Sequence, residues 1–196
     1  NIETSGKGKK GGLNPFKNKI ELIQLNTGTE IVICTPRGCS SDDLKDFFKM
    51  VFKYPIVGHN LMFDLSTIYV KTGLLPTKIF DTLYADILIK FSKKEGTNYK
   101  GVFKNSGLFD VTKKYCKIEL DKSEQTSDWG GNWTDKQLQY AEKDVKYLPT
   151  IVNKEVSSLN RIHSSLDPDV FNLKNKIARL EMKVLLVAIE LRVHGI

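Results

Sequence analysis

The chain has 196 residues, of which 40% are hydrophobic and 27% charged, and its formal net charge is +7. This size fits one domain or one domain with part of another, and no apolar run approaches the roughly 20 residues of a membrane span. No signal peptide opens the chain, and its three cysteines lack metal-ligand or disulfide spacing, which favours an intracellular protein with reduced thiols.

Strand signals dominate the first third of the chain. Residues 1–6 (NIETSG) look like the end of a strand and the turn after it. Two apolar, β-branched runs, 19–25 and 30–35, flank Asn26-Thr27-Gly28 and predict a β-hairpin. A further short, buried strand is predicted at residues 55–58.

Helical spacing begins near residue 42, with Ser41 or Asp42 available as the N-cap. Further helices are predicted at about 60–72 and at about 81–91, and the polar, glycine-bearing residues 92–107 are predicted to form a loop.

The second half is predicted to be mainly helical. Thr134 with Gln137 three residues later forms a capping-box pattern that starts a helix, and Pro149 is expected to end or kink it. A last helix begins near Asp169 and stops at Gly195. One apolar face of it is predicted to contain Leu173, Ile177, Leu180, Val184, Leu185, Ala188 and Leu191. Early strands followed by helices indicate a mixed α/β domain.

Three segments carry residues that can bind a cation together. Asn1 and Glu3 point to the same face of a strand, Asp64 lies near a helix start, and Tyr140 and Asp144 are one helical turn apart. Mg²⁺ and Mn²⁺ prefer such oxygen ligands, and two ions about 4 Å apart can drive phosphodiester cleavage. A tyrosine with its ordinary pKa near 10 is better suited to orient water than to deprotonate it. Taken singly, each residue favours the structural interpretation, in which the acids are solvated and the tyrosine is half-buried in the core.

The surrounding residues are more specific. NIETSG…LNPFKNKIELIQL is similar to a motif Asp-x-Glu-Thr-x-Gly-Leu-x-Pro followed by a strand, and VGHNLMFDLSTI is similar to a second motif. IFDTLYADILI resembles the segment between motifs, and residues 108–148, from LFDVTKKYC to AEKDVKYL, resemble a third block. These segments, which cover nearly all of residues 1–155, resemble the DEDDy-type 3′→5′ exonuclease domains of family-A, bacterial polymerase I-like DNA polymerases.

The resemblance implies an α/β, RNase H-like exonuclease fold with a mixed central β-sheet flanked by helices. It places the exonuclease domain at 1–160 and a connector with the start of a polymerase thumb helix at 161–196. The implied reaction is proofreading: hydrolysis of the 3′-terminal phosphodiester with release of nucleoside monophosphates. The implied partners are a single-stranded DNA 3′ end or primer terminus and a polymerase domain in the same parent chain.

The resemblance also implies the site roles. Glu3 and Asp144 would hold the metal that binds the attacking water, Asp64 would serve the second metal, and two Mg²⁺ or Mn²⁺ ions are the implied cofactors. The implied set is Asn1, Glu3, Asp64, Tyr140 and Asp144 for catalysis, all but Tyr140 as metal ligands, with Leu13 and Asn60 for substrate binding.

Three nearby residues are given structural interpretations. Phe63 is expected to pack in the core, and His59 is expected to be a bystander. For Trp129, packing is favoured over base stacking, because buried aromatic residues are commoner than stacking platforms.

Two features depart from the family pattern. Asn1 stands where the pattern has an aspartate, and an amide offers one neutral oxygen and an NH₂ group that repels a cation. We therefore expect this chain to bind a 3′ end but degrade it poorly, and the intact remaining positions favour a deliberate substitution. The second departure is Lys7–Gly12, an insertion interpreted either as a basic flap on DNA phosphates or as a solvated loop.

Two alternatives remain open from the sequence. One is a free-standing RNase D- or helicase-type exonuclease, and the other is a catalytically retired DNA-holding module. The lysine-rich composition is typical of an AT-rich genome, so an organellar (apicoplast or similar) location is a further hypothesis.

Overall fold

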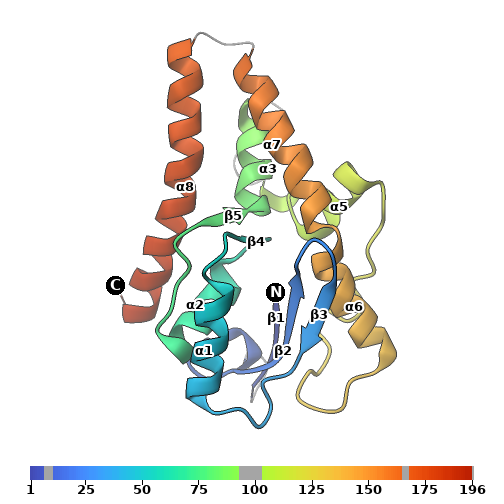
Figure 1. The fold of residues 1–196 in the computed structure, drawn as a ribbon. Helices are drawn as coiled ribbons and strands as arrows, with labels where there is room; N and C mark the ends of the chain where they lie inside the picture. The colour runs from blue at the N-terminus through green and yellow to red at the C-terminus, as the bar shows by residue number, and fades with distance from the viewer. Residues whose placement is uncertain (7–10, 93–102, 165–167, 196) are drawn as a thin grey trace.

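Two small sheets lie at the centre of the structure, a computed structural model that describes residues 1–6, 11–92, 103–164 and 168–195. Strands β1 (Ile2–Ser5), β2 (Lys19–Asn26) and β3 (Ile31–Cys34) form an antiparallel sheet in that order. Strands β4 (Ile56–Gly58) and β5 (Ile79–Asp81) pair in parallel beside it (Figure 1). The predicted hairpin at 19–35 is therefore confirmed.

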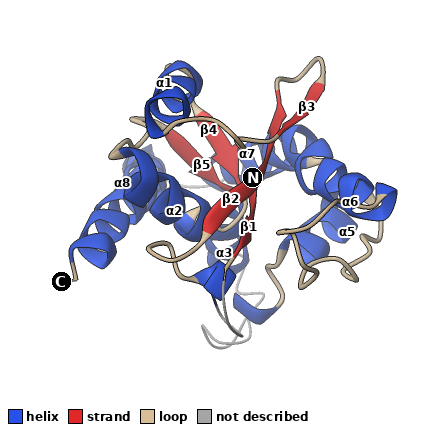
Figure 2. Ribbon diagram, turned by 90° about the horizontal axis from the view of Figure 1, so that it is seen from below, coloured by secondary structure: helices blue, strands red, loops and turns tan. Residues whose placement is uncertain are grey.

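Helices cover both sides of the sheets, so the mixed α/β expectation is confirmed. Helix α6 packs against β2 and β3, whereas α1, α2 and α8 gather on the opposite side (Figure 2). A short 3-10 helix, η1 (Gly11–Leu13), follows the first turn. The α-helices are α1 (Ser41–Val51), α2 (Met62–Thr72), α3 (Thr82–Ser92), α5 (Leu108–Cys116), α6 (Asp135–Lys146), α7 (Leu148–Ser164) and α8 (Pro168–His194).

Several boundaries differ from the sequence-based expectation. Strand β5 and helices α5 and α7 were not predicted. The strand at 55–58 is not fully buried, because Val57 is 38% exposed. Of the predicted loop at 92–107, residues 93–102 lie outside the described residues.

The N-cap of α1 is Ser40, so the prediction of Ser41 or Asp42 is wrong. The Ser40 hydroxyl accepts a hydrogen bond from the Asp43 backbone N–H at 3.1 Å, and the Asp43 carboxylate accepts one from the Ser40 N–H at 2.8 Å. The two reciprocal hydrogen bonds of this capping box place the helix start one residue earlier than the hydrophobic spacing in the sequence indicated.

The cap gives a direct prediction. Ser40→Ala should lower the free energy of unfolding by about 1 kcal/mol, because one N–H of the first turn loses its acceptor. Urea unfolding measures this, and Ser41→Ala, one residue inside the helix, is the matched control. An equal loss in both variants would contradict the assignment of Ser40 as the cap.

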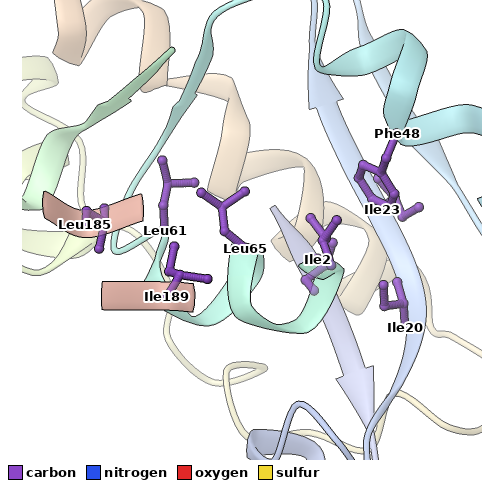
Figure 3. Close-up of a cluster of buried hydrophobic side chains, with 9 residues drawn as sticks. Ile2, Ile20, Ile23, Phe48, Leu61, Leu65, Leu185 and Ile189 are labelled. Atoms are coloured by element: carbon purple, nitrogen blue, oxygen red, sulfur yellow. The ribbon is translucent and has the colours of Figure 1, made fainter. Parts of the chain in front are cut away.

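One hydrophobic cluster ties β1 and β2 to the helices on one side of the sheet. Ile2 of β1 lies between Leu65 of α2 and Ile23 of β2, and Ile189 of α8 closes the other end (Figure 3). The buried members are Ile2, Ile20, Ile23, Phe48, Leu61, Leu65, Ile68, Leu185 and Ile189. This packing fixes the start of β1 against the start of α2.

The packed side of α8 agrees with the predicted one only in part. Leu185 of the predicted apolar face is buried, but Leu180, Val184 and Leu191 of that face are 58%, 50% and 43% exposed, and Ile189, outside it, is buried. The side chain of Leu173 lies outside the described part of the structure. The helix contacts α2, α3, α7 and β5, and its exposed apolar side chains are not covered by any other described residue. Gly195, with φ of 75°, ends the helix as predicted.

None of the helices in the described part of the chain combines the length and apolar content that a bilayer crossing requires.

Candidate active site

Asn1 and the first residues of β1 bring an amide and a carboxylate to the same face. The Asn1 side-chain N–H₂ donates to Glu3 Oε1 at 3.2 Å and to Asp144 Oδ2 of α6 at 3.5 Å. The side chains of positions 1 and 3 therefore lie on the same face, as predicted, and Asp144 of α6 lies beside them. The Asn1 amide lies between two carboxylates.

Asp64 approaches from the first turn of α2. Its side chain is buried, and Oδ1 accepts a hydrogen bond from the Ile2 backbone N–H at 2.9 Å. Burial raises the pKa of Asp64 above its ordinary value. The neighbouring residue Leu65 is anchored in the core, so Asp64 is held rigidly behind the start of β1.

The acids in this cluster destabilise one another's charge. Burial, followed by the negative charges of Asp144 and Asp64, raises the pKa of Glu3 to about 8. Burial also raises the pKa of Asp144 to about 7, although a hydrogen bond from Tyr140 opposes the shift. No lysine or arginine lies within 4 Å of these carboxylates in the described part of the chain. The N-terminal ammonium of Asn1 opposes these pKa shifts in part, and a bound cation would supply further positive charge.

Tyr140 shares a face of α6 with Asp144, one turn away. Burial, then the charges of Asp144 and Glu3, raises the pKa of Tyr140 far above its ordinary value, so its hydroxyl stays protonated. Its ring lies 6.2 Å from that of Trp129, which is buried with Leu22 and Ala141. The packing interpretation of Trp129 is thus confirmed.

All seven sequence-predicted site residues line one pocket of about 590 Å³. The acidic cluster forms one end of it. Leu13, which ends η1 and is 61% exposed, and Asn60, which precedes α2, complete the wall. The set that the structure brings together is Asn1, Glu3, Leu13, Asn60, Asp64, Tyr140 and Asp144.

The far wall of the pocket comes from residues that had no predicted role. Phe103 and Lys104 line it from the segment before α5, and Phe109 lines it from the first turn of α5. The Lys122 ammonium lies 4.2 Å from the Phe109 ring centroid. Leu120 and Gln125 also line this wall. The sequence signal for Leu120, Lys122 and Gln125 was the LDKSEQ run inside the third motif block, whereas Phe103 and Lys104 lie before that block.

His59 and Phe63 also line the pocket. His59 Nδ1 lies 2.8 Å from the Thr82 hydroxyl, and burial lowers the pKa of His59 to about 4, so its ring is neutral at pH 7. Phe63 is half-buried: it packs against the core cluster, as predicted, and also faces the pocket.

Of the insertion Lys7–Gly12, residues 7–10 lie outside the described part of the chain. The carbonyl of Gly12 accepts hydrogen bonds from Thr4 Oγ1 at 2.7 Å and from Asn18 Nδ2 at 3.0 Å. These bonds fasten the end of the insertion, and with it Leu13, to β1.

The donor set fits a divalent cation in chemistry but is incomplete. Carboxylates and an amide carbonyl are the oxygen ligands that Mg²⁺ and Mn²⁺ prefer. However, no three His, Cys, Asp or Glu side chains among the described residues converge as a ready-made metal-binding group. Asn1 presents an N–H₂ group, rather than a further carboxylate, to Glu3 and Asp144.

An oxygen-rich, acidic pocket end on this fold suits the class of nucleases that use divalent metals for phosphodiester cleavage. Residues 10–158 match the sequence profile of the 3′-5′ exonuclease family. The chain belongs to this family, as a DEDD-type 3′-5′ exonuclease domain.

The curated relatives of the chain include both a DNA polymerase and a ribonuclease. The chain is 30% identical over 162 residues to DNA polymerase I of Aquifex aeolicus, covering 78% of this chain and 26% of that protein. It is 31% identical over 156 residues to ribonuclease D of Bartonella henselae, covering 76% and 35%. The chain thus spans about a quarter to a third of these relatives.

Solved structures share the fold. Brucella melitensis NrnC bound to pGG has a TM-score of 0.73 at 22% identity, covering 99% of this chain and 84% of that chain. The same protein with bound Mg²⁺ has a TM-score of 0.68 at 20% identity, with the same coverage. The predicted RNase H-like exonuclease fold is confirmed, with its strands hydrogen-bonded as two separate sheets in the described residues.

Proposed function

We propose that this chain is the proofreading 3′→5′ exonuclease domain of a family-A DNA polymerase, impaired by asparagine at position 1. The observation that carries the proposal is the single pocket in which Asn1, Glu3, Asp64, Tyr140 and Asp144 meet. The similarity to DNA polymerase I of Aquifex aeolicus supports the polymerase context.

The division into an exonuclease domain at 1–160 and a connector with the start of a polymerase thumb at 161–196 is part of this proposal. Exposed apolar residues form a row along α8 at spacings of four, three and four: Leu180, Val184, Val187 and Leu191. A polymerase domain in the same parent chain would cover this row.

In the proposed reaction, a water oxygen attacks the phosphorus of the terminal phosphodiester. The bond from phosphorus to the O3′ of the preceding nucleotide breaks, a proton passes to that O3′, and a nucleoside 5′-monophosphate leaves. Tyr140 orients the water by its hydroxyl, because its raised pKa prevents it from acting as a base at neutral pH. Leu13 and Asn60 hold the terminal nucleotide at the pocket wall.

Glu3, Asp64 and Asp144, with the side chain at position 1, would hold two divalent ions. The binding of Mg²⁺ by NrnC supports divalent metal use in this fold. When bound, such ions activate the water and stabilise the leaving oxygen. The protein's part is to keep the carboxylates together, although their raised pKa values show that this costs free energy without a cation.

Processing of RNA is a second candidate, favoured by the similarity to ribonuclease D of Bartonella henselae. Both candidates predict digestion with 3′→5′ polarity. The preference for DNA or RNA as the substrate distinguishes them.

The test uses the Asn1→Asp chain and single strands of DNA and RNA with the same sequence, labelled at the 5′ end. A ladder of shortening products from the DNA, formed faster than from the RNA, is the expected result. Faster digestion of the RNA would support the ribonuclease candidate, and release of the 5′ label as a mononucleotide at early times would contradict both.

A further inference from the structure

Asp81, the last residue of β5, is a fully buried carboxylate outside the acidic cluster. Its Oδ1 accepts hydrogen bonds from the backbone N–H groups of Asn60 and Leu83, both at 2.9 Å, and its Oδ2 accepts one from Leu61 N–H at 2.8 Å. No lysine, arginine or histidine forms an ion pair with Asp81 in the described part of the chain. Burial raises the pKa of Asp81, and the three backbone amides oppose that shift.

The three amides belong to two helix starts. Leu61 immediately precedes α2, and Leu83 is in the first turn of α3. The first N–H groups of a helix have no partner inside the helix and carry the positive end of its dipole. Leu61, at the N-cap of α2, makes no side-chain capping hydrogen bond, whereas Asp81 immediately precedes α3 and itself accepts from Leu83 N–H in the first turn of that helix. One carboxylate thus serves both helices.

The turn that Asp81 holds is tightly constrained. Gly58 pairs with Asp81 in the parallel sheet, and a Cβ at position 58 would meet Leu61 Cδ2 at 2.2 Å. Two residues later, Asn60 has a φ of 58°, in the left-handed region that asparagine adopts more readily than most residues with a side chain. The hydrogen bond from Asn60 N–H to Asp81 holds this conformation in place.

The same turn presents part of the pocket. Asn60 precedes α2, while Phe63 and Asp64 are in its first turn, and all three line the pocket. A shift of the turn would move the Asn60 side chain and the first turn of α2 together.

We propose that Asp81 is a positioning residue for substrate binding: it fixes Asn60 and the start of α2 in the orientation that receives the 3′-terminal nucleotide. This inference rests on the proposed function, because it takes the pocket to be the site of a nucleic-acid 3′ end. Asp81 acts through Asn60 and does not itself line the pocket.

The test measures equilibrium binding of a fluorescent single-stranded DNA with a free 3′ end by anisotropy, so that no cleavage is required. Asp81→Asn keeps the shape of the side chain but removes its charge and turns an N–H₂ group toward backbone N–H donors. We expect affinity to fall about tenfold, the loss typical of one hydrogen bond to a charged group. In the Asn1→Asp background, KM should rise by a similar factor while kcat changes little.

A double-mutant cycle separates positioning from general destabilisation. Asn60→Gly removes the side chain but tolerates the left-handed backbone. If Asp81 acts through Asn60, the double variant should bind about as weakly as Asn60→Gly alone. Ile151→Ala, a fully buried residue of α7 away from the pocket, is the stability control and should leave binding unchanged.

Three results would each overturn the inference. These are additive losses of DNA-binding affinity in the cycle, unchanged affinity in Asp81→Asn, and an equal loss of affinity in Ile151→Ala. Should Asp81→Asn fail to fold, Asn60→Ala provides a second comparison. Both Asn60→Ala and Asn60→Gly remove the asparagine side chain, but alanine resists the left-handed conformation. Asn60→Ala should therefore bind DNA more weakly than Asn60→Gly. Equal binding by the two variants would count against positioning. If the parent chain binds no 3′ end at all, the proposed function fails first.

Discussion

Replacing Asn1 with aspartate should raise Mg²⁺-dependent digestion of single-stranded DNA by about 100-fold or more. The present amide offers one neutral oxygen, and its N–H₂ group donates to Glu3 and Asp144, the residues that would bind the ion. Aspartate removes those donors, adds a second oxygen and adds a negative charge. The expected gain in activity is therefore larger than adding one oxygen ligand alone would give.

The measurement is the initial rate of 3′ shortening with Mg²⁺ or Mn²⁺, together with a metal titration followed by Trp129 and Trp133 fluorescence. The double variant Asn1→Asp/Asp144→Asn is the control for contaminating nuclease and should return to the original rate. A folded Asn1→Asp chain without added activity or tighter metal binding would contradict the site assignment and favour the DNA-holding module.

Removing the buried carboxylate of Asp86 should lower the free energy of unfolding by about 3–5 kcal/mol. Asp86 of α3 is fully buried and pairs with Lys90 at 2.7 Å and with Lys114 of α5 at 2.9 Å. It also accepts hydrogen bonds from Ser106 at 2.8 Å and Tyr115 at 3.1 Å. Asp86→Ala would leave two ammonium groups without their shared partner, and it would release the far wall of the pocket from α3.

Urea unfolding at pH 7 measures this loss, and Asp46→Ala, which breaks an exposed pair with Lys49, should change stability little. The pH dependence has a definite sign. Burial alone would raise the pKa of Asp86, but hydrogen bonds from Lys90, Lys114 and Ser106 outweigh it and hold the pKa below 3.8. Since the folded pKa lies below the unfolded one, the stabilisation is complete above about pH 4 and is lost as pH falls further.

Accordingly, the difference between the original chain and Asp86→Ala should shrink below pH 4. A difference that is constant with pH would show that the carboxylate contributes by packing rather than by charge.

The elements that were predicted are those with a local signal. The hairpin of β2 and β3 has alternating apolar residues on both sides of a turn, and α6 has the Thr134 cap and its partner Gln137. In contrast, β5 has only three residues, and its pairing with β4 depends on residues more than 20 positions away. Helix α7 was missed because Pro149 was interpreted as an end, although proline is well tolerated in a first helical turn.

The order of the motifs predicted which residues meet in the pocket. For Asn1 and Glu3, strand alternation alone already predicted that both side chains point to the same face. The far wall with Phe103 and Lys122 depends on how α5 and the following loop pack, which no periodicity encodes. Asp81 was hidden for another reason: in the described residues its side chain accepts from backbone N–H groups, which have no signature in the sequence.

The exposed row on α8, Leu180, Val184, Val187 and Leu191, has an evolutionary consequence. Uncovered apolar surface promotes aggregation, so selection would replace it with polar residues in any relative in which nothing lies against this helix. Stand-alone exonucleases should therefore carry lysine, glutamate or glutamine at these four positions, and relatives with a following domain should keep them apolar. The side chains along one helix would then record whether the ancestor of each relative worked alone or as part of a larger protein.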